Sequence, residues 1–195
     1  MKKNKRLIAI AGGIGSGKSI VSAIMRINGY FVYDCDSRAK YLMNTSDDIK
    51  TDLKSSFGPE CITHEGKINS AYISSIVFKD KTALSKINSI VHPRVKDDIL
   101  QEFELCNQDI MFVETAILLQ SNLLPIIDEV WLVDAPEDVR VKRVMLRNAI
   151  TADEVKQRIQ AQQGQDYSIL NNCKTIINDG ICALLPQISC LMNDF

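Results

Sequence analysis

Residues 12–19 read Gly-Gly-Ile-Gly-Ser-Gly-Lys-Ser, which matches the pattern G-x-x-x-x-G-K-S/T at every fixed position. The glycines let the backbone turn its N–H groups inward, and such a nest binds an anion. The apolar run 7–11 before the loop predicts a buried strand, and residues 18–28 carry apolar side chains at helical spacing. A strand, an anion-binding loop and a helix in this order predict an open α/β fold that binds a nucleoside triphosphate at the helix N-terminus.

Residues 12–19 thus form a phosphate-binding loop (P-loop), in which particular side chains have expected roles. Lys18 is expected to reach the β- and γ-phosphates of ATP, and the Ser19 hydroxyl is expected to bind Mg²⁺. The full set of expected ATP contacts in the loop is Gly13, Ile14, Gly15, Ser16, Gly17, Lys18, Ser19 and Ile20. A chance glycine-rich turn would not require a buried strand before it and a helix after it. The motif alone does not separate kinases from nucleotide-dependent switches and motors.

Four further apolar runs predict strands, and each is followed by a polar residue. The runs are 30–33 before Asp34, 110–113 before Glu114, 129–133 before Asp134, and 175–177 before Asn178. In an open parallel sheet the ligand crevice lies at the carboxyl ends of the strands, so Gly12, Asp34, Glu114 and Asn178 should lie along one edge. The predicted fold is a three-layer P-loop α/β fold with a mostly parallel five-stranded sheet.

The rest of the chain is helical in pattern. Residues 37–105 are interrupted at Phe57-Gly58-Pro59 and, we expect, at His92-Pro93. Residues 151–165 are polar and open with Thr151 three residues before Glu154, a typical capping pair. At 195 residues the chain fits one domain. We expect a core of about 1–36, 106–139 and 166–195, a helical insert at about 37–105, and a lid at about 140–165.

Charged side chains near the predicted crevice suggest phosphoryl transfer. Asp34 is placed to orient an acceptor hydroxyl and take its proton, and the alternative for it is a cap of the helix that starts near Ser37. For Asp36 the cap is the expected role. For Glu114 two interpretations remain open, a ligand in the magnesium shell or a cap of the following turn.

Arginines recur in the segment that leads into the lid. Arg140, Arg143 and Arg147 are spaced by three and four residues and so share one helix face. Such a row is often solvated. Since arginine suits bidentate phosphate contact, we expect Arg143 and Arg147 to reach the transferring phosphate when the lid closes.

Composition narrows the class of protein further. Twenty-three basic residues against 24 acidic ones give a net charge of −1, which argues against general binding to nucleic acid. No segment approaches the ~20 consecutive apolar residues of a membrane helix, and the run behind the basic N-terminus is too short for a signal peptide. The six cysteines form no CxxC pair, so we expect reduced thiols in a cytoplasmic protein, with Cys182 and Cys190 as small apolar residues. A monomer or a small homo-oligomer is expected.

Several motifs together closely resemble the dephospho-CoA kinase family. The family carries a G-G-I-G-S-G-K-S/T loop, here 12–19, and an Asp-Ala-Asp signature, here Asp34-Cys35-Asp36. It also carries a His-Pro pair, a Lys-Arg-x-x-x-Arg lid helix, a lid glutamine and a final Ile-x-Asn-x-Gly. Their counterparts are His92-Pro93 followed by Arg94, Lys142-Arg143 through Arg147, Gln162, and residues 176–180. The resemblance covers essentially the whole chain, in the right order.

The resemblance implies a reaction and further site residues. ATP would phosphorylate the ribose 3′-hydroxyl of dephospho-CoA with Mg²⁺ as cofactor, which gives CoA and ADP in the last step of coenzyme A biosynthesis. Asp34 would be the base, His92 and Arg94 would line the acceptor side, and Asn178 would lie near the adenine of ATP. ATP and dephospho-CoA would be the only partners, with no nucleic acid and no membrane.

The chain departs from the family pattern at two positions. Gln120 stands where the family often has a glutamate, and Lys174 stands where it usually has an aspartate. The alternatives are a kinase of another small metabolite, such as a nucleoside or nucleotide, and a nucleotide-dependent switch. A guanine-specific switch would need an Asn-Lys-x-Asp base reader, which the sequence lacks.

Overall fold

The computed structural model describes residues 5–77, 80–162, 166–193 and 195. The chain divides into two compact units, which we call the sheet unit (Met1–Tyr33 with Cys106–Phe195) and the helical unit (Asp34–Leu105). Each unit is considered by itself. The predicted lid boundary near residue 165 lies outside the described residues.

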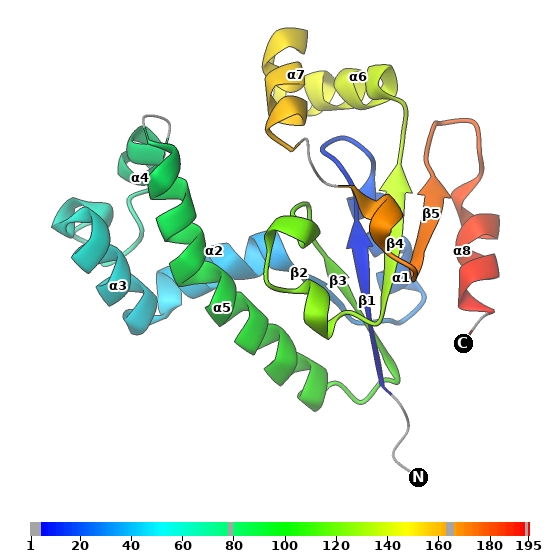
Figure 1. The fold of residues 1–195 in the computed structure, drawn as a ribbon, viewed down its shortest axis with the longest axis horizontal. Helices are drawn as coiled ribbons and strands as arrows, with labels where there is room; N and C mark the ends of the chain where they lie inside the picture. Colours follow the sequence, from blue (N-terminus) through cyan, green and yellow to red (C-terminus); the bar gives the residue numbers. More distant parts are fainter. Residues whose placement is uncertain (1–4, 78–79, 163–165, 194) are drawn as a thin grey trace. The chain divides into compact units, whose positions relative to one another are not determined.

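A five-stranded sheet lies at the centre of the sheet unit (Figure 1). Its strands are β1 (Arg6–Ala11), β2 (Val32–Asp34), β3 (Ile110–Glu114), β4 (Glu129–Asp134) and β5 (Cys173–Ile177), in the spatial order β2-β3-β1-β4-β5. The pairs β1·β3, β1·β4 and β4·β5 are all parallel. The predicted fold class is therefore confirmed.

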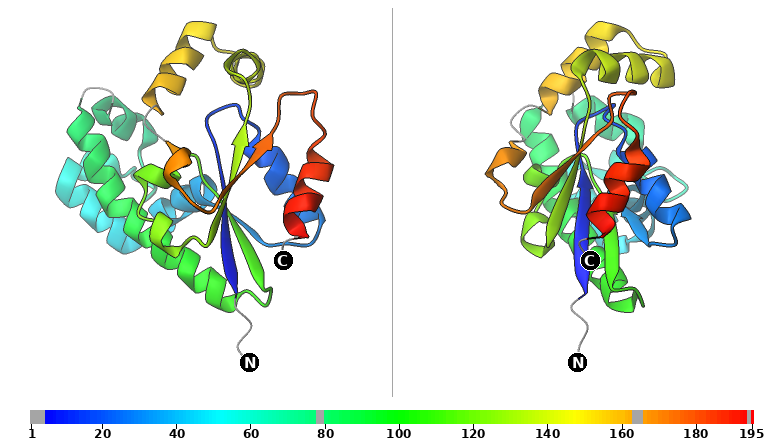
Figure 2. Two further views of the ribbon diagram at one scale, coloured as in Figure 1. Left: turned by 45° about the vertical axis from the view of Figure 1, so that its right-hand side comes forward. Right: turned by 90° about the vertical axis from the view of Figure 1, so that its right-hand side faces the viewer.

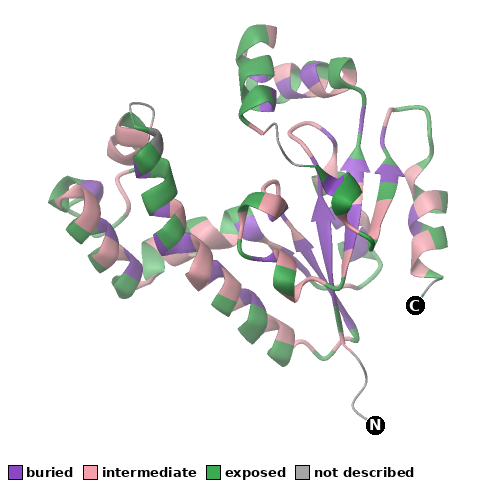
Figure 3. Cartoon of the chain, viewed as in Figure 1, coloured by how far each residue is buried: buried purple, intermediate pink, exposed green. Residues whose placement is uncertain are grey.

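Two helices cover one face of this sheet, α1 (Lys18–Ile27) and α8 (Leu184–Met192), as the side view in Figure 2 shows. Val21 and Met25 of α1 and Ile188 of α8 pack into one core with buried side chains of the strands. β1 is buried along almost its whole length (Figure 3), because a central parallel strand has neighbours on both sides and both faces. The core holds the end of β1, where the P-loop begins.

β2 begins two residues later than the predicted strand. Helix α1 ends in a Schellman motif, in which the Tyr30 N–H donates to the Met25 carbonyl and the Gly29 N–H donates to the Arg26 carbonyl, both at 3.0 Å. Gly29 adopts φ +88°, the left-handed conformation that this motif requires. Tyr30 therefore belongs to the helix cap and lies outside the strand, although its aromatic side chain favours a strand.

Helices α6 (Glu137–Asn148) and α7 (Ala152–Ala161) follow β4 and lie beyond the carboxyl ends of the central strands (Figure 1). Val141 and Val144 of α6 pack with Val155 and Ile159 of α7 in a small core of their own. The predicted cap is present, since Thr151 and Glu154 form a full capping box. Three short 3₁₀ helices, η2 (Leu118–Gln120), η3 (Leu124–Ile126) and η4 (Tyr167–Ile169), complete the unit.

The helical unit contains α2 (Cys35–Thr45), α3 (Asp47–Phe57), the 3₁₀ helix η1 (Pro59–Cys61), α4 (Ser70–Val77) and α5 (Lys81–Leu105). α5 packs against α2, α3 and α4, so it is the central helix of this unit. Its buried side chains include Ile87, Ile90, Val95 and Ile99.

The predicted break at His92-Pro93 is wrong, because α5 runs through Pro93 without interruption. Proline removes one intrahelical hydrogen bond and crowds the preceding turn. The buried residues Ile90 and Val91 precede it and Val95 follows it, so packing on both sides keeps the helix continuous. The Arg94 guanidinium also donates to the Ile90 carbonyl at 3.3 Å, in the turn that the proline disturbs.

All six cysteines are free. Cys182 and Cys190 are exposed, so these two thiols lie at the surface. In the described part of the chain, no helix combines the length and apolarity that crossing a bilayer would require.

Candidate active site

The P-loop connects the end of β1 to the start of α1. Gly17, the N-cap residue of α1, adopts φ +100°, and a Cβ added there would collide with the Asn178 side-chain nitrogen. A Cβ added at Gly12 would collide with the Val133 carbonyl oxygen of β4. Glycine is therefore required at both ends of the loop, by close approach as well as by conformation.

The loop carries one ammonium group and two hydroxyl groups that could contact a bound phosphate, those of Lys18, Ser16 and Ser19. The Lys18 ammonium lies over the loop, 2.8 Å from the Gly12 carbonyl and 3.2 Å from the Gly13 carbonyl. Ser19 is exposed in the first turn of α1. The Ser16 hydroxyl is fully buried and, among the described residues, has no hydrogen-bond partner. An orphaned hydroxyl inside an anion nest fits a bound phosphate oxygen as its missing acceptor.

Both backbone polar groups of Ile14 are bound by residues of the segment that contains α6 and α7. The Ile14 N–H donates to Gln162 Oε1 at 2.8 Å, directly after α7, and Arg140 Nε of α6 donates to the Ile14 carbonyl at 3.1 Å. The Arg140 guanidinium carbon would lie 3.0 Å from a Cβ added at Gly13. The second and third residues of the loop thus lie against Arg140 of α6 and Gln162 after α7.

Asn178 follows β5 directly and is only 5% exposed. Its side-chain nitrogen donates to the Ser16 carbonyl at 2.8 Å. Arg143 of α6 donates to the Asn178 carbonyl at 2.9 Å and to its side-chain oxygen at 3.3 Å. Arg143, predicted as a catalytic residue, is therefore connected to the P-loop through a single asparagine.

Arg147, the second predicted lid arginine, is in a different setting. It is exposed at the end of α6, and its Nε donates to the neighbouring Asn148 side chain at 3.1 Å. Of the three arginines on this helix, the two nearer the N-terminus reach the loop or Asn178 through their hydrogen bonds.

Glu114 is the last residue of β3 and pairs in register with Ile10 of β1, two residues before the P-loop. The turn that follows is closed by Thr115 Oγ1, which accepts from the Ile117 N–H at 3.3 Å. The Glu114 carboxylate is half-buried at the strand end, and both interpretations of it stay predictions.

Asp34 ends β2 and also caps α2. Its Oδ1 accepts from the Asp36 and Ser37 N–H groups at 3.0 and 3.1 Å, and its Oδ2 accepts from the Ser37 hydroxyl at 2.8 Å. The expectation that Asp36 provides this cap is wrong, since Asp36 lies exposed in the first turn of the helix. A carboxylate offers about four acceptor positions, so one remains for an acceptor hydroxyl.

The predicted acceptor residues His92 and Arg94 both lie on α5 in the helical unit. Arg94 Nη2 forms an ion pair with Asp52 of α3 at 2.7 Å. His92 is half-buried, and this burial lowers the pKa of its imidazole below the usual 6.5. His92 therefore favours the neutral form. Of the two predicted acceptor residues, Arg94 is the one that carries a positive charge.

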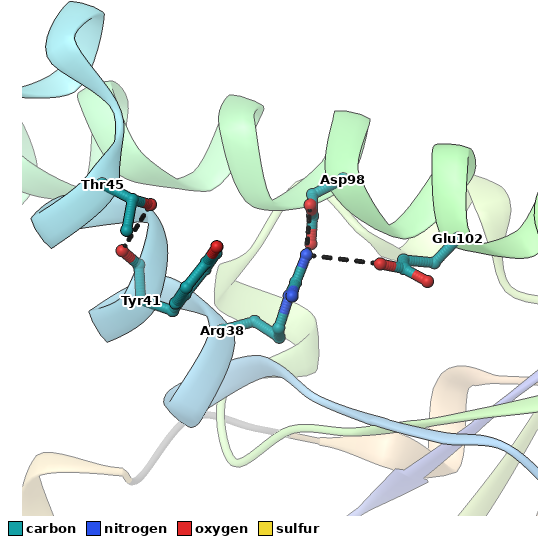
Figure 4. A network of polar contacts seen from close by, with 5 residues as sticks. All are labelled: Arg38, Tyr41, Thr45, Asp98 and Glu102. Carbon is teal, nitrogen blue, oxygen red and sulfur yellow. Dashed lines mark hydrogen bonds and ion pairs between the residues drawn. The ribbon is translucent and has the colours of Figure 1, made fainter.

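A second arginine of the helical unit, Arg38, is also paired with carboxylates, as Arg94 is. Arg38 of α2 forms a two-fold contact with Asp98 of α5, at 2.9 Å from Nε and 2.6 Å from Nη2, and its Nη2 lies 3.3 Å from Glu102 (Figure 4). The guanidinium also lies 5.0 Å from the centre of the Tyr41 ring. These contacts fasten α2 to α5.

Two residues that contact the loop were absent from the predicted site, Arg140 and Gln162. Arg140 belonged to the predicted arginine row, and Gln162 matched the family's lid glutamine, so both carried a weak signal. Their contacts with Ile14 span 126 and 148 residues of sequence, and spacing alone could not reveal them.

Comparisons with known proteins show the family of this chain. A family model described as dephospho-CoA kinase matches residues 6–183. The chain belongs to the dephospho-CoA kinase family. A dephospho-CoA kinase of Porphyromonas gingivalis is 37% identical over 172 residues, which cover 84% of this chain and 85% of that protein. One from Bacteroides fragilis is 36% identical over 183 residues, 93% of this chain and 88% of its own.

Solved structures show the same fold. A Thermus thermophilus protein, TT1252, superposes with a TM-score of 0.83 at 28% identity and covers 99% of both chains. A dephospho-CoA kinase from Campylobacter jejuni superposes with a TM-score of 0.66 at 20% identity, covering 97% of this chain and 95% of that one. The family match makes this chain a kinase, and the solved structures share its P-loop α/β fold.

The two departures from the family pattern lie in defined places. Gln120 is exposed at the end of η2. The Lys174 ammonium lies 3.7 Å from the carboxylate of Glu129, the first residue of β4. Lys174 is thus directed toward the amino end of the sheet, opposite to the P-loop.

Proposed function

We propose that the chain transfers the γ-phosphoryl group of ATP to the ribose 3′-hydroxyl of dephospho-CoA, which gives CoA and ADP in the last step of coenzyme A biosynthesis. The observation that carries the proposal is the family match over residues 6–183, which includes an intact P-loop and the lid helices. The family supplies the acceptor, and the loop supplies the phosphate donor site.

On the donor side, the loop residues Gly13 to Ile20 would surround the triphosphate. The Lys18 ammonium would move from the loop carbonyls to the β- and γ-phosphates, and the orphaned Ser16 hydroxyl would gain an acceptor. Arg143 and Arg147 would face the negative charge that develops on the transferring group.

The donor set fits Mg²⁺, which takes oxygen ligands and keeps several waters. Ser19 offers a hydroxyl at the start of α1, and Glu114 offers a carboxylate at the end of β3. Within the described ranges no cluster of three or more His, Cys, Asp or Glu could hold a metal ion. When bound, Mg²⁺ would neutralise charge on the β- and γ-phosphates.

Asp34 would orient the 3′-hydroxyl and accept its proton. The hydroxyl oxygen forms a bond to the γ-phosphorus while the bond to the β,γ-bridging oxygen breaks, and ADP leaves with that electron pair. The free acceptor position of the Asp34 carboxylate would receive the proton.

The variant Asp34→Asn tests this assignment without loss of the helix cap, because asparagine caps helices as well as aspartate does. We expect kcat to fall about 100-fold or more while the ATP dissociation constant changes little. Steady-state kinetics and calorimetric ATP binding would measure both. Turnover like that of the unmodified protein would remove Asp34 from the base assignment.

On the acceptor side, we propose that the insert at about 37–105 binds dephospho-CoA and that the segment at about 140–165 is the lid. His92 and Arg94 of α5 would contact the acceptor, with Arg94 exchanging Asp52 for an acceptor phosphate. The resemblance also implies that Asn178 lies near the adenine of ATP, but both polar groups of its side chain already have protein partners.

We further propose a cytoplasmic enzyme that acts as a monomer or small homo-oligomer. The six free cysteines are consistent with a reducing compartment. ATP and dephospho-CoA would be its small-molecule substrates.

The deciding experiment measures ADP release with ATP and Mg²⁺ while the acceptor is varied. Dephospho-CoA, nucleosides and nucleoside monophosphates would be supplied in parallel, with an acceptor-free control. We expect rapid release only with dephospho-CoA and CoA as the product. Release that responds to a nucleoside or nucleotide would support the alternative kinase and exclude the proposed acceptor.

A further inference from the structure

Asn178 occupies an unusual position for a residue expected to contact a nucleobase. It is buried beneath the P-loop, and its backbone N–H donates to the Asp134 carbonyl at 2.8 Å, which fixes the residue at the end of β4 and β5. Its side-chain nitrogen and oxygen already have partners, the Ser16 carbonyl and Arg143. A base reader would need at least one of these amide groups to face the ligand.

The bond to Ser16 controls the direction of a loop peptide. A trans peptide is planar, so its carbonyl and the following N–H point in opposite directions. Because Asn178 holds the Ser16 carbonyl at 2.8 Å, the Gly17 N–H is aimed away from Asn178. Gly17 is the N-cap of α1, where N–H groups and the helix dipole favour a phosphate.

The bonds from Arg143 control the direction of a lid side chain. Two nitrogens of its guanidinium donate to two oxygens of Asn178, the carbonyl at 2.9 Å and the side-chain oxygen at 3.3 Å. Two bonds from one planar group restrict its orientation more than one bond would. Asn178 is a neutral partner, so the charge of Arg143 is not cancelled by this contact.

We propose that Asn178 is a positioning residue for phosphoryl transfer and that it does not read the adenine base. It sets the Ser16–Gly17 peptide and the Arg143 guanidinium in one arrangement, so that the loop and the lid arginine meet the triphosphate together. This proposal rests on the proposed function for its kinetic readout.

The variant Asn178→Asp separates the two contacts, because the carboxylate still accepts from Arg143 but cannot donate to Ser16. Asn178→Ala removes both side-chain contacts and leaves only the bond from Arg143 to the backbone carbonyl of residue 178. The matched control is Asn172→Asp, since the Asn172 side chain also donates to a backbone carbonyl, that of Asp128, just before the opposite end of β5.

Three kinetic quantities decide the matter, namely kcat, KM for ATP and the ratio of kcat/KM for ATP over GTP. We expect both Asn178 variants to lower kcat about 10- to 100-fold while KM and the ATP-to-GTP ratio stay within about three-fold. Asn172→Asp should leave all three unchanged. Asn178→Ala should add little to the loss in Arg143→Ala, because the two residues act as a unit.

The opposite result would overturn the proposal, namely an unchanged kcat with a raised KM for ATP and a relaxed preference over GTP. Turnover like that of the unmodified protein in Asn178→Asp would overturn it equally.

Amide hydrogen exchange over residues 12–19 adds a readout that needs no turnover, and faster exchange is expected in Asn178→Asp but not in Asn172→Asp. Unchanged exchange would count against the proposal even where kcat falls. If the unmodified protein fails to phosphorylate dephospho-CoA, the proposed function falls, while this exchange comparison still tests Asn178.

Discussion

The arginines of the two units are held in different ways. In the sheet unit, Arg140 and Arg143 donate to backbone carbonyls and an amide oxygen, all of them neutral. In the helical unit, Arg38 and Arg94 form ion pairs with Asp98 and Asp52. An arginine with neutral partners keeps its charge for a ligand, whereas a paired one must first exchange its carboxylate.

The comparison shows which arginine side chains already have a fixed position and an uncompensated charge before a substrate binds. The sheet unit presents positive charge beside the P-loop at fixed positions, and preorganised charge stabilises a phosphoryl-transfer transition state at little reorganisation cost. In the helical unit the ion pairs link α2 and α3 to α5 and so contribute to its packing. Arg94 would serve an acceptor only by giving up Asp52.

The largest expected effect comes from removing a cation with neutral partners. Arg143→Ala should lower kcat about 100-fold or more, since the charge acts on the transferring phosphate. Arg158→Ala, which removes an exposed arginine from α7, is the control. Steady-state kinetics measures both, and equal losses in the two variants would show that overall lid charge, not the placement of Arg143, matters.

The fixed loop geometry gives the next effect. Gly17 and Gly29 both have positive φ, +100° and +88°, but only a Cβ at Gly17 would meet another residue, Asn178. Gly29→Ala should cost about 1 kcal/mol of unfolding free energy through backbone strain, and Gly17→Ala should cost roughly 2 kcal/mol or more. Denaturant unfolding measures the difference. Equal costs would mean that the Asn178 side chain moves away from the added methyl group without a loss of stability.

A smaller effect is expected from the paired arginine. Arg94→Ala should raise KM for dephospho-CoA about 10-fold while KM for ATP is unchanged, because one charged contact with the acceptor is lost. Asp52→Asn should leave KM for dephospho-CoA the same or slightly lower, since Arg94 no longer has to exchange a carboxylate. A large rise in KM for Asp52→Asn would show that the ion pair positions Arg94 instead of competing with the acceptor.

The smallest effect concerns pH. Burial lowers the pKa of His92 in the folded protein below its ordinary value of 6.5, so the unfolded chain binds a proton more readily. The contribution to stability is present above pH 6.5 and is lost as pH falls below it. His92→Gln should flatten the fall in unfolding free energy between about pH 7 and pH 5 relative to the unmodified protein. The same pH profile of unfolding free energy in His92→Gln and in the unmodified protein would contradict a lowered pKa of His92.

Much of the sheet unit was predictable, because its signals are local. An apolar run followed by a polar residue marked the ends of β3, β4 and β5, and the P-loop motif contains its own geometry. The contacts of Ile14 with Gln162 and Arg140 were not predictable, since they depend on how two lid helices fold back over the loop. Local spacing carries no information on such long-range packing.

The predictions from the sequence were wrong where a local preference of one residue was overridden by tertiary packing or by the path of the backbone. Pro93 predicts a break, yet buried residues on both sides keep α5 continuous. Asp34 and Asp36 are both good caps by type, and only the backbone path after β2 gives the position to Asp34. Arg94 and Asp52 lie 42 residues apart, so their pairing could not be predicted from the sequence.

The most direct test of the account follows the phosphoryl group itself. ATP labelled in the γ-phosphate would be mixed with dephospho-CoA and an excess of enzyme, and the labelled product would be identified by chromatography and by 3′-specific phosphatase treatment. The account predicts that the label is found in CoA and is released from the 3′ position. Label found only in inorganic phosphate, at the same rate with and without dephospho-CoA, would contradict it.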